Sequence, residues 1–349
     1  MRVGELDYRL PDEAVAQAAI EPRDASRLLV TETMEDRLFS DLPELLAPGD
    51  LVVVNRTRVR AARLTGRRAP SGGRVEALLL RRVDTDRWEA LLRPARRLHA
   101  GDLIELDGVT GRLLSDPVGG VATMGLTSES GDVDDLLPTI GSVPLPPYFR
   151  GELSDPERYQ TMFAKTVGSA AAPTAGLHFT PSLVDRLAAR GIAIAEVELE
   201  VGLDTFRPMT AERTEDHHIH RERYLVPDDA AERIAATHAA AGRIVAVGTT
   251  VVRTLETAAQ APGVVVPGAG ESDLFIAPGH VFRVVDAIVT NFHAPRTTLI
   301  ALVAAALGSR WRTVYDAALG RGYRFLSFGD AMLIDPMKQR PGRSADAPR

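Results

Sequence analysis

The sequence predicts an α/β domain with an inserted small antiparallel β-barrel domain, and three observations support this fold class. Helix-like and strand-like segments alternate after residue 180, which is typical of an α/β domain. Residues 61–137 contain short apolar or alternating runs separated by paired glycines, which indicates the closely spaced strands of a barrel. An apolar run at residues 50–55 precedes the barrel, so the α/β domain begins before it. We expect residues 1–58 and 141–335 to form the α/β domain, residues 59–140 the barrel and residues 336–349 a disordered tail.

Each element has its own signal in the sequence. The run at residues 50–55 follows the turn Pro48-Gly49 and predicts a buried strand. Residues 141–160 carry four prolines, which is typical of a stiff connection between domains. Barrel strands are predicted at residues 74–80, 88–92, 103–106 and 121–126.

The α/β pattern resumes at Thr180, an N-cap residue followed by Pro181 at the first helical position, and this helix ends at Gly191. Apolar residues alternate with glutamates over residues 195–201, which predicts a strand with one wet face. The remaining predictions are helices at residues 228–241, 251–259 and 298–307 and strands at residues 244–247 and 281–289.

Composition excludes several classes of protein. Hydrophobic residues make up 45% and charged residues 25%, which is ordinary for a folded globular chain. The absence of cysteine excludes disulfides, thiol nucleophiles, cysteine-ligated zinc and iron–sulfur clusters. Acidic residues stand near the N-terminus where a signal peptide needs an apolar run, and the longest apolar stretch, residues 299–307, is too short to span a bilayer. We expect a cytoplasmic protein without a membrane segment.

A strongly basic segment begins at the end of the first predicted strand. Residues 56–97 contain thirteen arginines against four acidic residues, although the whole chain has a formal charge of −6. Alternation along an extended segment would place Arg56, Arg58 and Arg60 on one side, where they could contact phosphates. Structured RNA fits such a surface, and a solvated strand face is the alternative.

Three junctions between strand and helix are rich in polar residues: residues 173–180, 248–250 and 291–298. Open α/β sheets bind ligands at the carboxyl ends of their strands, so these junctions could line one cleft. The candidate residues are Thr174, Gly176, His178, Thr249, Thr250, Asn291 and His293. Ordinary helix capping by Thr180, Thr250, and Thr297 or Thr298 is the alternative for the threonines.

A group of titratable residues lies at residues 215–222, where His217, His218 and His220 are flanked by acidic residues. Such a set suits proton transfer near neutral pH. A metal site is the rival interpretation, but the spacing lacks the paired helical histidines of zincins. Two other function classes therefore stay open: a metal-dependent hydrolase and a non-catalytic RNA-binding module. No dinucleotide-binding or Walker-type glycine motif is present.

Several long motifs, spread over the chain, carry a resemblance to a known family. They include residues 54–59, 143–148, 171–179, 205–208, 216–222, 247–250 with Arg253 and Glu256, and 290–293. With these residues the chain resembles the S-adenosylmethionine:tRNA ribosyltransferase-isomerases of queuosine biosynthesis. Asp204 departs from the family pattern, which usually has glycine there.

The resemblance implies transfer and isomerisation of the ribosyl group of S-adenosylmethionine onto 7-aminomethyl-7-deazaguanine at the tRNA wobble position, giving epoxyqueuosine. S-adenosylmethionine is then a co-substrate, and no cofactor or metal is expected. The expected partners are S-adenosylmethionine and tRNA carrying the modified base, and we expect a monomer. The expected catalytic residues are His178, His217, His220 and Glu222. The expected substrate-binding residues are Asn55, Arg56, Thr57, Arg58, Thr174, Gly176, Thr205, Thr249, Thr250, Arg253, Asn291 and His293.

Overall fold

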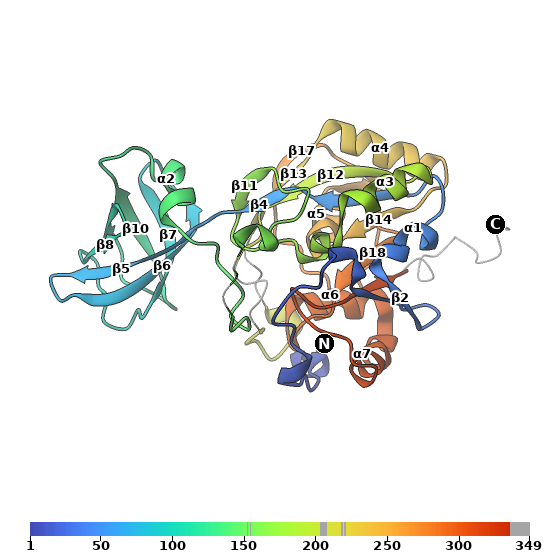
Figure 1. Cartoon of the computed structure of the whole chain (residues 1–349), viewed down its shortest axis with the longest axis horizontal. Helices are drawn as coiled ribbons and strands as arrows, with labels where there is room; N and C mark the ends of the chain where they lie inside the picture. Colours follow the sequence, from blue (N-terminus) through green and yellow to red (C-terminus); the bar gives the residue numbers. More distant parts are fainter. Residues whose placement is uncertain (152, 154, 203–207, 218, 220, 336–349) are drawn as a thin grey trace. The chain divides into compact units, whose positions relative to one another are not determined.

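The computed structural model describes residues 1–335 except residues 152, 154, 203–207, 218 and 220, and the chain divides into two compact units (Figure 1). One unit comprises Met1–Arg58, Pro146–Thr166 and Ala172–Arg349, and the other comprises Val59–Leu145 and Val167–Ala171. The first contains a mixed sheet with helices and the second a closed antiparallel barrel, which confirms the predicted fold class. In this division residues 141–145 and 167–171 group with the barrel, whereas the sequence places them in the α/β domain. The predicted tail lies outside the described residues.

A nine-stranded sheet organises the larger unit in the order β17-β13-β12-β3-β14-β18-β19-β1-β2. Its strands are β1 (Arg27–Val30), β2 (Glu35–Leu38), β3 (Leu51–Asn55), β12 (Ala193–Leu199), β13 (Glu222–Val226), β14 (Ile244–Val247), β17 (Gly268–Ser272), β18 (Ala287–Asn291) and β19 (Ala331–Ile334). The four central strands, β12, β3, β14 and β18, are mutually parallel. Their carboxyl ends therefore lie along one edge of the sheet.

Helices cover both faces of this sheet. Alternate residues of β3 divide between two hydrophobic cores, because successive side chains of a strand point to opposite faces. Leu51 and Val53 pack in the core formed with α4, α5, α6 and α7, whereas Val52 and Val54 pack with α1 and α3. These helices are α1 (Leu42–Leu45), α3 (Pro181–Ala189), α4 (Asp228–Ala239), α5 (Thr249–Thr257), α6 (Thr298–Leu307) and α7 (Trp311–Gly320). Two short ladders pair β4 (Thr57–Val59) with β11 (Thr166–Ser169) and β15 (Ala259–Ala261) with β16 (Val264–Val265).

The smaller unit is a closed six-stranded barrel in the order β10-β7-β6-β5-β8-β9, followed by α2 (Val133–Ile140). The strands are β5 (Arg63–Ala69), β6 (Gly73–Arg82), β7 (Arg87–Arg93), β8 (Leu103–Leu106), β9 (Val109–Leu113) and β10 (Val121–Thr127). Trp88 and Met124 are fully buried in it. A Cβ atom at Gly66 would lie 2.0 Å from the carbonyl oxygen of Glu105, so only glycine permits the close approach of β5 to β8.

Most predicted elements are confirmed within a few residues, but one strand is wrong. The predicted helix at residues 251–259 begins two residues earlier, at Thr249. The predicted strand at residues 281–289 begins only at Ala287, because the N–H groups of Arg283, Val284 and Val285 donate to the buried carboxylate of Glu256 at 2.8–3.0 Å. A segment whose N–H groups bond to a side chain cannot give them to a neighbouring strand.

Candidate active site

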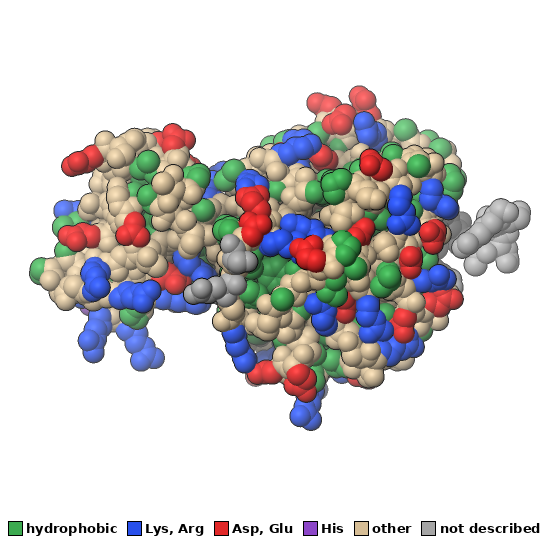
Figure 2. Space-filling view, viewed as in Figure 1, with side chains coloured by type: hydrophobic (Ala, Val, Ile, Leu, Met, Phe, Trp, Pro, Cys, Tyr) green, Lys and Arg blue, Asp and Glu red, His purple; other side chains and the backbone are tan. Residues whose placement is uncertain are grey.

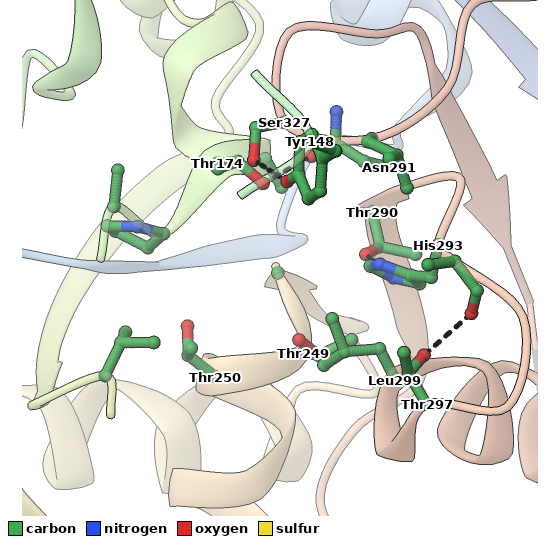
Figure 3. Close-up of a pocket in the computed structure, with 17 residues that line it drawn as sticks. Tyr148, Thr174, Thr249, Thr250, Thr290, Asn291, His293, Thr297, Leu299 and Ser327 are labelled. Atoms are coloured by element: carbon green, nitrogen blue, oxygen red, sulfur yellow. Dashed lines mark hydrogen bonds between the residues drawn. The ribbon is translucent and has the colours of Figure 1, made fainter. Parts of the chain in front are cut away.

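A pocket of about 590 Å³ lies at the carboxyl ends of β14 and β18 (Figure 3). Five of the seven candidate residues in the three predicted polar junctions line it: Thr174, Thr249, Thr250, Asn291 and His293. The three junctions therefore do meet in one pocket. The described residues that line it include no lysine, arginine, aspartate or glutamate, so hydroxyl, amide and imidazole groups supply its polarity.

The turn between β14 and α5 presents backbone donors to this pocket. Gly248 has a φ of 89°, a left-handed conformation that favours glycine, and it is the N-cap residue of α5. No side chain of the described residues caps this helix end. The first N–H groups of a helix have no partner within it, so those of Thr249 and Thr250 can bond to a ligand.

A chain of hydrogen bonds fixes Asn291 at the end of β18. The Thr174 hydroxyl donates to Asn291 Oδ1 at 2.9 Å. The Asn291 amide nitrogen donates to the Asp330 carbonyl oxygen at 3.3 Å and lies 3.1 Å from His178 Nε2. With the amide oriented in this way His178 Nε2 accepts, so Nδ1 carries the proton and donates to the Ser26 hydroxyl at 2.7 Å. His178 is thus held as a neutral tautomer.

His178 does not line the pocket, and of the other candidate residues in the junctions only Gly176 shares this. It is 5% exposed and stacks on Phe39 with ring centroids 4.8 Å apart. Burial lowers the pKa of His178 to about 3, with smaller contributions from Arg324 and Arg23. A base with such a pKa accepts protons poorly near pH 7, so the structure gives His178 the geometry of a positioning residue.

His293 is the histidine that lines the pocket. Its Nε2 lies 3.0 Å from the Thr290 hydroxyl, and no hydrogen bond to Nδ1 occurs among the described residues. The backbone is held from both sides, because Tyr8 donates to its carbonyl oxygen at 2.6 Å and its N–H donates to the Tyr315 hydroxyl at 3.1 Å. Burial lowers the pKa of His293 to about 3. The imidazole is therefore neutral at physiological pH.

The two buried histidines predict a pH dependence of stability. Because both have a pKa near 3 in the folded chain and 6.5 as the ordinary value, the unfolded chain binds more protons between these values. Stability is therefore expected to fall as pH drops below about 6.5, by about 1.4 kcal/mol per pH unit for each histidine. Urea unfolding measures the free energy of unfolding at several pH values between 4.5 and 6. Plotted against pH, this free energy should have a shallower slope for His178→Asn than for the wild type. Equal slopes would contradict the assignment of a neutral His178.

Glu222 and Arg253 form a buried ion pair away from the main pocket. They are 7% and 8% exposed. Glu222 also accepts the N–H of Gly202 at 2.7 Å, while Arg253 donates to the carbonyl oxygens of Leu274 and Ser272 at 3.2 and 3.3 Å. Arg253 does line a smaller neighbouring pocket together with Thr249 and Thr250. The pair thus joins β13, α5 and the segment after β17.

The other predicted site residues lie elsewhere or outside the described part of the chain. His217 is half-buried beside Phe275, with ring centroids 5.7 Å apart, and does not line the main pocket. Gly176 is buried in the segment before α3, where a Cβ atom would come within 3.0 Å of Thr161. Thr205 and His220 are outside the described residues.

Asn55 and Thr57 join two strands at the same edge of the sheet. Asn55 Oδ1 accepts the N–H groups of Thr57 and Leu199, and its amide nitrogen donates to the Leu199 carbonyl oxygen at 3.0 Å and to the Thr250 hydroxyl at 3.4 Å. The Thr57 hydroxyl donates to the Leu199 carbonyl oxygen at 3.1 Å. Asn55 therefore holds a pocket-lining threonine in place.

The three arginines predicted to form one basic face each have a carboxylate partner. Arg56 pairs with Glu196 and Glu198, Arg58 with Glu157, and Arg60 with Asp134. These carboxylates neutralise much of the positive charge that the sequence predicted for a face formed by Arg56, Arg58 and Arg60. Five arginines of the segment are exposed and have no ion pair among the described residues: Arg67, Arg74, Arg93, Arg96 and Arg97.

The sequence reasoning missed Tyr148, Thr290 and Ser327, all of which line the pocket. Tyr148 is hydrogen-bonded to Ser327, and Ser327 follows Leu326, which has a left-handed φ of 70°. The proline-rich connection gave no sign that Tyr148 reaches the site.

Among the described residues, no group of three or more histidine, aspartate or glutamate side chains could hold a metal ion. No helix there is long and apolar enough to cross a membrane.

Comparisons with known proteins agree over nearly the whole chain. The model of a family described as queuosine biosynthesis protein matches residues 3–334. A relative from Symbiobacterium thermophilum named S-adenosylmethionine:tRNA ribosyltransferase-isomerase is 50% identical over 342 residues, which cover 96% of this chain and 100% of the relative. A relative of the same name from Moorella thermoacetica is 49% identical over 348 residues, with the same coverage. A crystal structure of S-adenosylmethionine tRNA ribosyltransferase from Thermotoga maritima is similar with a TM-score of 0.54 and 38% identity, covering 94% of this chain and 99% of that one.

Proposed function

Because this chain belongs to the S-adenosylmethionine:tRNA ribosyltransferase-isomerase family of transferases, we propose that it forms epoxyqueuosine in tRNA. The ribosyl group of S-adenosylmethionine is transferred to the aminomethyl group of 7-aminomethyl-7-deazaguanine at the wobble position and isomerised to an epoxycyclopentane. Adenine and methionine leave. The observation that carries this proposal is the convergence of three polar junctions on one pocket in a chain that matches the family throughout.

The charge of the pocket suits this co-substrate. S-adenosylmethionine carries a sulfonium cation, which a cationic pocket would repel. The described residues of the lining include no lysine or arginine, and the lowered pKa of His293 keeps its imidazole uncharged. The attacking group is the amine of the substrate, so the protein needs no nucleophile of its own, in agreement with the absence of cysteine. Its task is to position the two substrates and to move protons.

The arrangement suggests a role for each group. His293 Nδ1 is placed to hydrogen-bond a substrate and orient it, because Nε2 is held by Thr290. Asn291, fixed by Thr174 and His178, orients a substrate through its amide. We assign His178 and Glu222 positioning roles, and we propose His217 and His220 as proton-transfer residues.

Incubation of the protein with S-adenosylmethionine and tRNA carrying the aminomethyl-deazaguanine tests this function. Mass spectrometry of the nucleosides should show epoxyqueuosine, with release of adenine and methionine, and added chelator should not prevent the reaction. Binding of S-adenosylmethionine without a new nucleoside, across several precursor tRNAs, would refute the proposal. A requirement for stoichiometric metal would instead favour the hydrolase alternative.

We propose that the five unpaired arginines of the barrel contact tRNA phosphates. Arg67 and Arg74 are direct cross-strand partners on β5 and β6, and Figure 2 shows Lys and Arg side chains gathered along one edge of the barrel unit. Replacing Arg67, Arg74 and Arg93 with glutamine should weaken tRNA binding. The slope of log K against log salt should fall by about 0.7–0.9 for each phosphate that the variant no longer neutralises.

The matched control is the triple glutamine variant of Arg56, Arg58 and Arg60, whose charges are already paired within the protein. It should change the salt slope less than the barrel variant does. A larger effect of this control in a folded protein would restore the interface predicted from the sequence.

A further inference from the structure

A second pocket lies next to the first, and its lining includes three arginines: Arg23, Arg158 and Arg324. No aspartate or glutamate is among its described lining residues. Arg158 pairs at 2.7 Å with Glu21, whose side chain is 67% exposed, and Arg324 lies 3.5 Å from Asp330. Arg23 has no ion pair among the described residues. The pocket therefore presents more positive than negative charge.

The three guanidinium groups are held in place by backbone carbonyl oxygens. Arg23 donates to Gln160 and Glu157 at 2.8 and 3.2 Å, Arg158 to Ile20 at 3.1 Å, and Arg324 to Ala18 at 3.1 Å. Each guanidinium has five N–H donors, so donors remain for a ligand. These bonds orient the side chains before a ligand arrives, which lowers the entropic cost of binding.

The electrostatics agree with an excess of positive charge. Burial lowers the pKa of Arg23 and the nearby charge of Arg158 lowers it further, whereas the carboxylates of Glu21, Asp155 and Glu157 act in the opposite direction by smaller amounts. Arg324 and Arg23 also contribute to the lowered pKa of His178, which lines the same pocket. Arg23 and Arg158 therefore repel one another at this pocket, and an incoming anion would relieve that repulsion.

One wall separates this pocket from the candidate active site. Ser327 lines both pockets. His178 lines the arginine pocket and bonds to Asn291, which lines the main pocket. An anion held by the arginines would therefore be separated from the main pocket only by the side chains of Ser327, His178 and Asn291.

We propose that the arginine pocket binds a backbone phosphate of the tRNA beside the nucleotide that is modified, an inference that rests on the proposed function. Guanidinium forks match the geometry of phosphate oxygens. The carboxylate of S-adenosylmethionine is the other anion available, but it is accompanied by an ammonium group. That ammonium group would need an acidic partner, and the lining supplies none.

The test compares Arg23→Gln and Arg324→Gln with Arg190→Gln, which removes an exposed charge at the end of α3. The dissociation constants for precursor tRNA and for S-adenosylmethionine are measured separately on each full-length variant. Each pocket variant should weaken tRNA binding about tenfold or more and lower its salt slope by about 0.7, as expected when one phosphate is no longer bound. Affinity for S-adenosylmethionine should stay as in the wild type. Arg23→Lys keeps the positive charge and should restore the salt slope, but it lacks the guanidinium fork and should restore only part of the tRNA affinity.

Three results would overturn this inference. Weaker binding of S-adenosylmethionine with normal tRNA binding would identify the anion as the methionine carboxylate. Pocket variants that bind both substrates as Arg190→Gln does would leave the arginines with a structural role only. A wild-type protein that does not bind or modify precursor tRNA would remove the proposed function itself and the inference with it. Thermal melting checks that each variant is folded. If Arg324→Gln does not fold, the tRNA affinity of Arg23→Lys still tests the proposal.

Discussion

The His293→Ala variant is expected to convert precursor tRNA about a hundredfold more slowly than the wild type, because it removes a side chain that orients the substrates. The substitution removes the imidazole that lines the pocket, together with its hydrogen bond to Thr290. The backbone of residue 293 keeps its bonds to Tyr8 and Tyr315, so the pocket wall should persist. Single-turnover conversion, followed by nucleoside mass spectrometry with saturating substrates, measures the effect.

The control for this variant is His238→Ala, which removes a half-buried histidine on α4 outside the pocket. Its conversion rate should stay within about twofold of the wild type, since surface changes away from a site have small effects. His293→Gln retains a hydrogen-bonding group and should recover part of the rate if the role is orientation. A folded His293→Ala variant that converts tRNA at the wild-type rate would exclude His293 from the reaction.

The Glu222→Ala variant is expected to lower the free energy of unfolding by about 3–5 kcal/mol, because it leaves the Arg253 guanidinium buried without its carboxylate. The N–H of Gly202 loses its acceptor as well. Urea unfolding at pH 7 measures the loss. The double variant Glu222→Gln with Arg253→Met removes both charges and should recover much of the stability.

This experiment separates a structural carboxylate from a catalytic one. If Glu222 holds the fold, the double variant keeps measurable turnover once it is folded. A Glu222→Ala protein with wild-type stability and no turnover would instead return Glu222 to the proton-transfer role that the sequence suggested.

Strong local patterns predicted the core of the fold. β14 and α6 have the predicted bounds, because an apolar β-branched run and a capped apolar run each specify one structure. β5 and β9 were missed because their sequences, RLTGRRA and VTGRL, lack a convincing apolar alternation and owe their conformation to closure of the barrel. The strand predicted from residue 281 failed because a distant carboxylate, Glu256, binds its backbone.

The sequence predicted several of the polar residues at the ends of strands that line the candidate site, but not their burial or protonation. Thr249, Asn291 and His293 follow from the rule that ligands bind at the carboxyl ends of parallel strands. Burial and tautomer depend on interactions with residues far away in the chain. Ser26 and Phe39 decide the state of His178, and neither carries a signal for that role. The ion pair between Arg56 and Glu198 could not be predicted either, because the two residues lie far apart in the sequence.

The position of β19 has a consequence for the order in which the chain can fold during synthesis. β19 lies between β18 and β1, so the N-terminal strands β1 and β2 join the sheet only through residues 331–334. All six barrel strands come from residues 63–127, and they can pair as soon as that stretch has left the ribosome. Pairings between distant residues form late because they close long loops. The barrel can therefore fold during translation, whereas β1 and β2 can join the sheet only after residues 331–334 have been synthesised.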